Sequence, residues 1–277
     1  MNSWRPPSDC LDLVDGIWQA KAISPVYYPE DGNETCLQVE ETSYWFNHRN
    51  QCIIEVLRQF PPGGRFYDIG GGNGFVAKAL QQAGIDVVLV EPGQGAFNAL
   101  QRGVKKVVRA TLHDAMFRTG SIPALGAFDV LEHIEDEARF LSEVRRVLKP
   151  GGRFYCTVPA MPSLWSHEDI QAGHFRRYSV KTLAQLLKGV GFITEFITYI
   201  FTWLVFAVLL LRTLPSRLGQ PSAQCRNAIL NTKAAHQLPL PFAGAVERVH
   251  NWELSRLHSR RSIPLGTSIL AVATRIL

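Results

Sequence analysis

The chain lacks the features that mark disulfide-rich secreted proteins, membrane-spanning proteins and nucleic-acid binders. Its 277 residues contain an odd number of cysteines, five, and no two have the spacing of a metal clip. This argues against a disulfide framework and favours a reducing cytoplasm. The N-terminal residues MNSWRPPSDCLDLVD have neither a basic flank nor an apolar core, so they predict no signal peptide. The net charge is +5, but there is no long run of lysine and arginine, and a nucleic-acid partner is not favoured.

Long apolar runs are also scarce. Residues 196–211 carry no charge, but these 16 residues are fewer than the roughly 20 that a membrane-spanning helix needs. Three interpretations remain open: a helix that completes the core, an apolar wall for a lipophilic substrate, or a peripheral membrane contact through residues 196–217, with Arg212 and Arg217 at the headgroups. We therefore expect a cytoplasmic protein that could associate with a membrane surface.

The composition is that of a globular protein, with 46% hydrophobic and 19% charged residues. Prolines interrupt residues 1–40, which are expected to be irregular, and a helix is predicted over residues 40–60. Strands and helices alternate from there. The predicted strands are 65–69, 86–90, 105–110, 122–128, 153–158, 192–198 and 268–276, and the predicted helices are 74–84, 95–103, 135–148 and 180–190.

This alternation predicts an α/β fold with a doubly wound, seven-stranded, mostly parallel sheet and helices on both faces. One domain would span residues 41–277. Residues 200–265 are more than the alternating pattern needs, and they are expected to form an apolar and basic helical insertion before the last strand.

A glycine-rich segment, Asp68-Ile69-Gly70-Gly71-Gly72-Asn73-Gly74, follows the first strand of the alternating region. Ligands of doubly wound sheets bind at the carboxyl ends of the strands, and glycines let the backbone approach a ligand closely. Glu91 follows the next strand, about 20 residues later, where an acidic residue binds a ribose diol. Asp68 stands where a dinucleotide fold needs glycine, which favours an adenosyl cofactor with a cationic amino group and no phosphates.

The glycine segment resembles the first motif of class I S-adenosylmethionine-dependent methyltransferases of the type 11/12 kind. Two later segments resemble that family's further signatures, Leu131-Glu132-His133-Ile134 and Arg146-Val147-Leu148-Lys149-Pro150-Gly151-Gly152. The resemblance covers residues 40–192 and the last strand. It implies a Rossmann-like methyltransferase fold and S-adenosyl-L-methionine as cofactor.

The resemblance also implies roles for individual residues. Asp68, Gly70, Gly71 and Gly72 would contact the methionine part of the cofactor, and Glu91 would hold the ribose. Asp114 would lie near the adenine amino group, unless it is a surface turn residue. Asp129 would face the methyl group at the floor of the pocket. Arg49, on the helix that covers the cofactor in similar proteins, could reach the methionine carboxylate or lie on the surface.

Methyl transfer to a hydroxyl needs a base, and histidine has a suitable pKa. One candidate is His133, although Glu132-His133 could instead be a helix-start motif. A second group follows the fifth strand of the alternating region: His167 or His174 as base, with Arg176, Arg177 and Tyr178 binding an anionic group of the substrate. The alternative is a salt-bridged loop that orders the next helix. The spacing of His167, Asp169 and His174 matches no common metal site.

These features favour a methyltransferase that O-methylates a small or lipid-like acceptor. Two alternatives remain open: methylation of a protein or nucleic acid, which would need a basic groove, and a non-catalytic module that binds the cofactor for a partner. The sequence does not indicate an oligomeric state.

Overall fold

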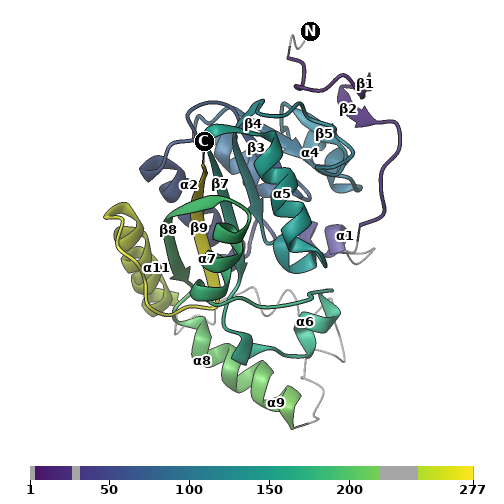
Figure 1. Cartoon of the computed structure of the whole chain (residues 1–277). Coiled ribbons are helices and arrows are strands. Elements are labelled where there is room, and N and C mark those ends of the chain that lie inside the picture. Colours follow the sequence, from purple (N-terminus) through teal and green to yellow (C-terminus); the bar gives the residue numbers. More distant parts are fainter. Residues whose placement is uncertain (1–3, 27–31, 219–242, 277) are drawn as a thin grey trace.

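The computed structural model describes residues 4–26, 32–218 and 243–276. Its centre is a sheet whose strand order is β1-β2-β5-β4-β3-β6-β7-β9-β8 (Figure 1). The strands are β1 (Leu11–Val14), β2 (Ile17–Ala20), β3 (Phe66–Ile69), β4 (Val87–Val90), β5 (Val107–Arg109), β6 (Ile122–Phe128), β7 (Leu148–Pro159), β8 (Phe192–Ile200) and β9 (Ser268–Arg275). Strands β5, β4, β3, β6 and β7 are parallel, whereas β9 is antiparallel to both of its neighbours. The predicted α/β class and the mostly parallel sheet are confirmed.

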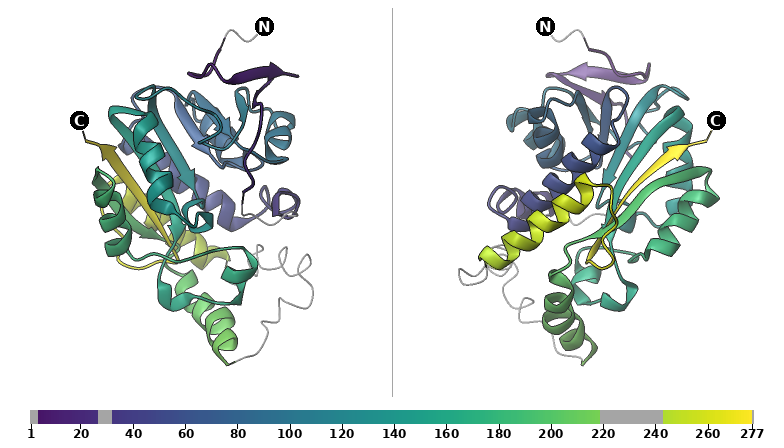
Figure 2. Two further views of the ribbon diagram at one scale, coloured as in Figure 1. Left: turned by 45° about the vertical axis from the view of Figure 1, so that its right-hand side comes forward. Right: turned by 90° about the vertical axis from the view of Figure 1, so that its left-hand side faces the viewer.

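Helices cover both faces of the sheet (Figure 2). Two helices pack on one face: α5 (Glu137–Val147) and α7 (Val180–Gly189). Four pack on the other: α2 (Tyr44–Gln59), α3 (Phe75–Gln82), α4 (Gly95–Gln101) and α11 (Ala243–His258). Each face therefore has its own apolar core. The sequence of β4 agrees with cores on both faces of the sheet. All four of its residues are apolar and buried, as expected for a parallel strand covered on both sides.

The N-terminal part differs from the prediction. Residues 1–40 were expected to be irregular, but β1 and β2 form a hairpin, and β2 pairs in parallel with β5. The described residues therefore form a sheet of nine strands, where seven were predicted. The turn is Asp15-Gly16, with φ values of 50° and 81°, the left-handed backbone that two-residue hairpin turns require. A short helix, α1 (Gly32–Leu37), follows.

The described residues between β8 and β9 are largely helical. They comprise α8 (Leu204–Val208), a π-helical turn η3 (Leu209–Thr213), α9 (Leu214–Arg217) and α11. The apolar stretch 196–211 is not one helix, because Phe196–Ile200 completes β8 and pairs with β9. Within the described ranges, no helix is long and apolar enough to cross a membrane.

Short helices complete the loops at the carboxyl ends of the parallel strands. They are η1 (Leu131–His133) after β6, and η2 (Pro162–Leu164) and α6 (His167–Gln171) after β7. Strands β3 and β4 also end there, so the predicted cofactor loop and the predicted histidine loops lie at one edge of the sheet.

Candidate active site

The glycine loop after β3 opens into a cavity of about 2290 Å³. Gly70 and Gly72 have φ values of 67° and 52°, a left-handed conformation that favours glycine. At Gly71, an added Cβ would lie 2.3 Å from Leu89 Cδ1 and 2.6 Å from Asp68 Oδ2. Side chains are therefore excluded at this loop, and its backbone lines the cavity.

Asp68, the last but one residue of β3, lines the same cavity and is fully buried. Among the described residues, neither of its carboxylate oxygens accepts a hydrogen bond of normal geometry. Burial raises the pKa of Asp68 to about 7, and the charge of Arg49 opposes that shift. A buried carboxyl that accepts no hydrogen bond of normal geometry is rare in a native protein. It fits a ligand with a cationic amino group, as S-adenosylmethionine has.

Glu91 follows β4, the strand next to β3, and lines the cavity. Its two oxygens accept hydrogen bonds from the backbone N–H groups of Gly72, at 3.0 Å, and Gly93, at 2.8 Å. Burial raises the pKa of Glu91, and these two N–H groups offset part of the shift. The carboxylate thus joins the glycine loop to the end of β4, the position expected for a ribose ligand.

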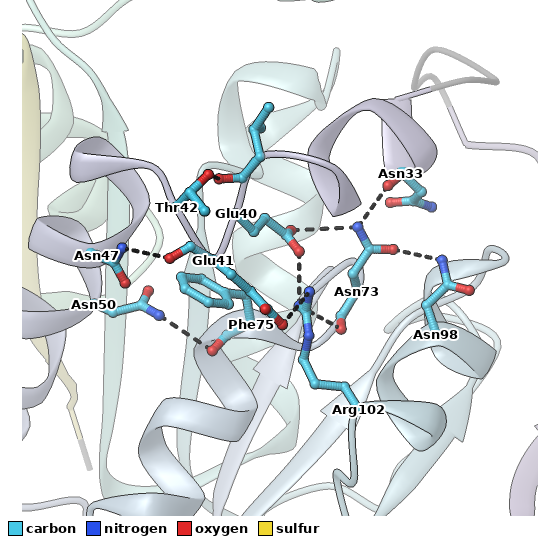
Figure 3. A network of polar contacts seen from close by, with 11 residues as sticks. Asn33, Glu40, Glu41, Thr42, Asn47, Asn50, Asn73, Phe75, Asn98 and Arg102 are labelled. Atoms are coloured by element: carbon cyan, nitrogen blue, oxygen red, sulfur yellow. Dashed lines mark hydrogen bonds and ion pairs between the residues drawn. The ribbon is translucent and has the colours of Figure 1, made fainter. Parts of the chain in front are cut away.

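The segment around α1 is fastened to the glycine loop by a polar network (Figure 3). The Asn73 amide donates to the Asn33 carbonyl at 2.7 Å and accepts from the Asn98 amide at 2.8 Å. Arg102 donates to the Glu40 carboxylate at 2.8 Å. Asn33 and Glu40 line the cavity, so this segment forms one of its walls. The sequence did not reveal this network, because the partners of Asn73 lie in distant segments that carry no recognisable motif.

Asp129 and Arg49 lie in the cavity wall and are bonded to each other, with Nη1 and Oδ2 2.5 Å apart. Asp129 also accepts a hydrogen bond from the Thr157 hydroxyl at 3.0 Å, and its φ of 57° is unusual for a residue other than glycine. Asp129 therefore lies at the cavity, where the sequence predicted it. Arg49 reaches the cavity too, but its guanidinium is paired with Asp129.

Asp114 does not line the cavity, contrary to the prediction that it contacts the cofactor. Its carboxylate accepts hydrogen bonds from the backbone N–H of Ser24 at 2.8 Å, the Ser24 hydroxyl at 2.8 Å and the Thr111 hydroxyl at 2.7 Å. Ser24, Pro25 and Val26 line the cavity instead. Asp114 thus anchors the N-terminal segment that borders the cavity.

His174 lines the cavity and is held by a buried carboxylate. Its Nδ1 lies 3.0 Å from Asp169 Oδ1. Asp169 also accepts from Arg177 at 2.8 Å and from the backbone of Ser166 at 2.9 Å. Burial raises the pKa of Asp169, but these partners outweigh it, so the pKa lies below the ordinary value. An ionised Asp169 accepts a hydrogen bond from the Nδ1–H of His174, and in a neutral imidazole this leaves Nε2 as a proton acceptor.

His167 does not reach the cavity. It is exposed at the start of α6, and its backbone N–H donates to the Ser216 hydroxyl at 3.1 Å. The prediction of His167 as a base therefore does not fit the structure. The reason is that Ser166 and Asp169 form a capping box at this turn, which leaves the intervening His167 side chain outside.

His133 and Glu132 follow β6 and also line the cavity. The rings of His133 and His174 meet edge to face, with centroids 4.8 Å apart. Burial lowers the pKa of His133 to about 4, and His174 adds to the shift, so His133 is neutral and weakly basic near pH 7. Ligand atoms of Glu132, His133 and His174 lie within 4.8 Å of one another. By residue type, this set could also bind a divalent cation.

Two residues predicted to bind substrate, Arg176 and Tyr178, instead form hydrogen bonds with the segment that follows β6. Arg176 donates to the carbonyls of Ile134, at 3.0 Å, and Glu135, at 2.8 Å, and neither Arg176 nor Tyr178 lines the cavity. Tyr178 is buried, with its hydroxyl bonded to Glu137. These two residues form the loop-ordering network that was the alternative interpretation. Arg177 does line the cavity, paired with Asp169.

One part of the cavity lining is largely apolar and comes from the insertion. It consists of Trp203, Leu204, Ala207, Val208, Leu211, Ala245, Val246 and Val249, with Arg212 among them. Outside the cavity, Phe206 and Leu210 of the same helical segment are 67% and 58% exposed. The insertion therefore contributes to the cavity and also presents an apolar surface.

A second histidine cluster, which the sequence did not reveal, joins α2 to α11. His48 Nε2 lies 2.8 Å from Glu253 Oε2 and 3.5 Å from the Cys52 sulfur. The ring of His250 stacks on that of His48, with centroids 3.6 Å apart. Glu253 also accepts from the backbone N–H groups of residues 201 and 202, which follow β8. None of these four side chains lines the cavity, so the cluster holds the insertion against α2.

Comparison with known proteins identifies the family. A family model described as a methyltransferase domain matches residues 44–195, more than half of the chain. The chain belongs to this family, and it is an S-adenosylmethionine-dependent methyltransferase. The cavity lining fits that cofactor, since the buried Asp68 carboxyl suits a cationic amino group and the Glu91 carboxylate suits a ribose.

Related proteins support this assignment. A probable S-adenosylmethionine-dependent methyltransferase of Mycolicibacterium smegmatis is 26% identical over 175 residues, which cover 62% of this chain and 68% of the relative. One from Mycobacterium tuberculosis is 25% identical over 178 residues, 63% of this chain and 65% of the relative. The match thus spans about two thirds of these relatives.

Solved structures share the fold. Phosphoethanolamine N-methyltransferase 2 of Haemonchus contortus has a TM-score of 0.56 at 19% identity, covering 94% of this chain and 62% of that chain. A chain solved in complex with the Haloferax volcanii Trm112 methyltransferase activator has a TM-score of 0.57 at 16% identity, covering 91% and 98%. At these identities the likeness extends to the fold.

Proposed function

We propose that this methyltransferase O-methylates a small or lipid-like acceptor, with His174 as the general base. The observation that carries the proposal is the His174–Asp169 pair at the cavity. Bound S-adenosylmethionine would supply an activated methyl group on sulfur. A hydroxyl acceptor must lose its proton as it is methylated, and the Nε2 lone pair of His174 can take that proton.

His174 is a better candidate base than His133. The pKa of His133, about 4, makes it a poor proton acceptor near neutral pH. Its ring packs against the ring of His174, and it would position that residue. Arg177 and Asp169 would keep the same imidazole oriented, since Asp169 is bonded to both.

The cavity has room for an acceptor beside the cofactor. Its volume of about 2290 Å³ exceeds the roughly 300–1,000 Å³ of an ordinary small-molecule site. The apolar wall from the insertion favours an acceptor with a hydrocarbon part. A basic groove for a nucleic acid would need a row of unpaired cations, whereas Arg49 and Arg177 in this cavity are paired with carboxylates.

The test is methyl transfer from S-adenosylmethionine carrying an isotope-labelled methyl group, incubated with the protein and separated pools of lipids, small metabolites, protein and nucleic acid. We expect label in the lipid or small-molecule pool, with the carbon spectrum of an O-methyl group. Label in protein or nucleic acid, or an N-methyl product, would overturn the proposal. If a chelator stops methyl transfer, a metal ion bound by Glu132, His133 and His174 activates the acceptor, and the assignment of His174 as general base is rejected.

A further inference from the structure

The apolar wall of the cavity is continuous over two helices of the insertion. Leu204, Ala207, Val208 and Leu211 recur at helical spacing along α8 and η3 and face the cavity. Val246, on α11, also lines it. In Figures 1 and 2, α8 and α9 project from the end of the molecule where α6 lies. This arrangement provides an elongated apolar surface beside the histidine loop.

Among the residues that the structure describes, one cation of this wall has no anionic partner. Arg212 is half-buried and lines the cavity, and no carboxylate of the described residues lies within ion-pair distance of it. Arg49 and Arg177, by contrast, are each paired at 2.5–2.8 Å. Burial raises the pKa of Tyr44, another cavity residue, and the charge of Arg212 opposes that shift.

The backbone at Arg212 is unusual. Residues Leu209–Thr213 form a π-helical turn, a rare conformation that is frequent at functional sites. Two residues that follow Arg212 in the sequence bond this turn and the next helix to the loop after β7. The Thr213 hydroxyl donates to the Leu164 carbonyl at 3.1 Å, and Arg217 donates to the Ser163 carbonyl at 2.8 Å. Arg212 therefore projects from an anchored part of the wall.

We propose that this part of the cavity is the acceptor subsite for an anionic amphiphile. Its hydrocarbon chain would lie along Leu204, Val208 and Val246, and its carboxylate or phosphate would bind Arg212. A planar guanidinium suits both of these anions. The proposal rests on the proposed function, since it assigns a class of lipid-like acceptor. The amphiphile could come from solution or from a bilayer, because Phe206 and Leu210 present apolar surface on the outside of the same helical segment.

The test is calorimetric titration of the protein with dodecyl phosphate below its critical micelle concentration, in parallel with S-adenosylmethionine. We expect dodecyl phosphate to bind at least about tenfold more tightly than dodecanol or inorganic phosphate. Arg212→Gln should weaken its binding about tenfold or more, as expected for loss of a charged hydrogen bond. Arg248→Gln, which removes an exposed arginine of α11 outside the cavity, should have no effect. Ala207→Trp should block the chain and also weaken binding.

Equal affinity of the wild-type protein and Arg212→Gln would overturn the subsite, provided that both variants still bind S-adenosylmethionine. Because no turnover is measured, this result would leave the proposed O-methylation standing. A second titration, with dodecyl phosphate presented in phosphatidylcholine vesicles, identifies where the ligand comes from. If Phe206→Ser weakens binding from vesicles but not from solution, the bilayer supplies the ligand. If Phe206→Ser changes neither, the ligand comes from solution. Dependence on Arg212 in either case supports the subsite.

Discussion

The two histidine clusters of this protein have similar parts and different surroundings. In each, one imidazole is held by a buried carboxylate: His174 by Asp169 and His48 by Glu253. In each, a second histidine packs on the first and has a pKa lowered to about 4, chiefly by burial: His133 and His250. The first pair lines the cavity, and the second lies between two helices away from it. Under the proposed function, the first arrangement serves catalysis and the second serves stability, and the difference between them is access to the cavity.

The cavity pair can be broken without unfolding the protein. His174→Ala should lower kcat by about 10² to 10⁴, the usual contribution of a general base. The melting temperature and the affinity for S-adenosylmethionine should change little. His167→Ala is the matched control, because His167 is exposed on the same loop and outside the cavity. Comparable loss of turnover in both variants would contradict the assignment of His174.

The second cluster should show the opposite result. Glu253→Ala leaves His48 buried without its carboxylate and two backbone N–H groups without an acceptor. Breaking a buried pair of this kind costs about 3–5 kcal/mol of unfolding free energy, measurable by denaturant titration. His258 is on the same helix as Glu253, and its exposed ring pairs with Glu55 of α2. His258→Ala should therefore lower the unfolding free energy by at most about 1 kcal/mol. Equal losses in the two variants would show that the cluster does not stabilise the insertion.

The affinity for S-adenosylmethionine should depend on the carboxylates near the ends of β3 and β4, and not on either histidine cluster. Asp68→Ala and Glu91→Ala should each weaken S-adenosylmethionine binding about tenfold to a hundredfold, as expected for loss of a charged hydrogen bond. Calorimetry measures this directly, with Asp12→Ala on the exposed face of β1 as the control. Unchanged affinity in Asp68→Ala would reject its contact with the cofactor.

A smaller effect concerns pH. Burial raises the pKa of Asp68 in the free protein to about 7, so this carboxyl is protonated in roughly half of the molecules at pH 7. A cationic ligand binds the ionised form, so affinity for S-adenosylmethionine should rise severalfold as pH increases through about 7. Asp68→Asn should abolish the slope. A slope that persists in this variant must come from another group.

The sequence predicted the elements that depend on local pattern. Strand β6 was predicted with its observed bounds, because a buried parallel strand is recognisable as a short, mostly apolar run. The glycine loop and Glu91 were predicted as well, since their spacing follows from the strand–loop–helix unit itself. The hairpin at the N-terminus was missed although Asp15-Gly16 is a strong turn signal, because the prolines nearby suggested irregular structure.

The remaining parts of the site depend on contacts between distant segments. Glu253 is 205 residues from His48, and no local pattern joins them. The choice among arginines was also beyond the sequence. Arg176 was predicted to bind substrate but donates to carbonyls of the preceding loop, whereas Arg212, assigned to lipid headgroups in one interpretation, lines the cavity. Which cation faces a cavity is decided by how the loops pack.

The most direct test of the account is an experimental structure with S-adenosylhomocysteine bound. We expect its amino group at the Asp68 carboxyl, its ribose at Glu91, and its sulfur facing the space between His174 and the apolar wall from the insertion. An acceptor placed in that space would then reach both the sulfur and the base. A sulfur directed away from His174, or a wall that closes the space, would contradict the proposed O-methylation.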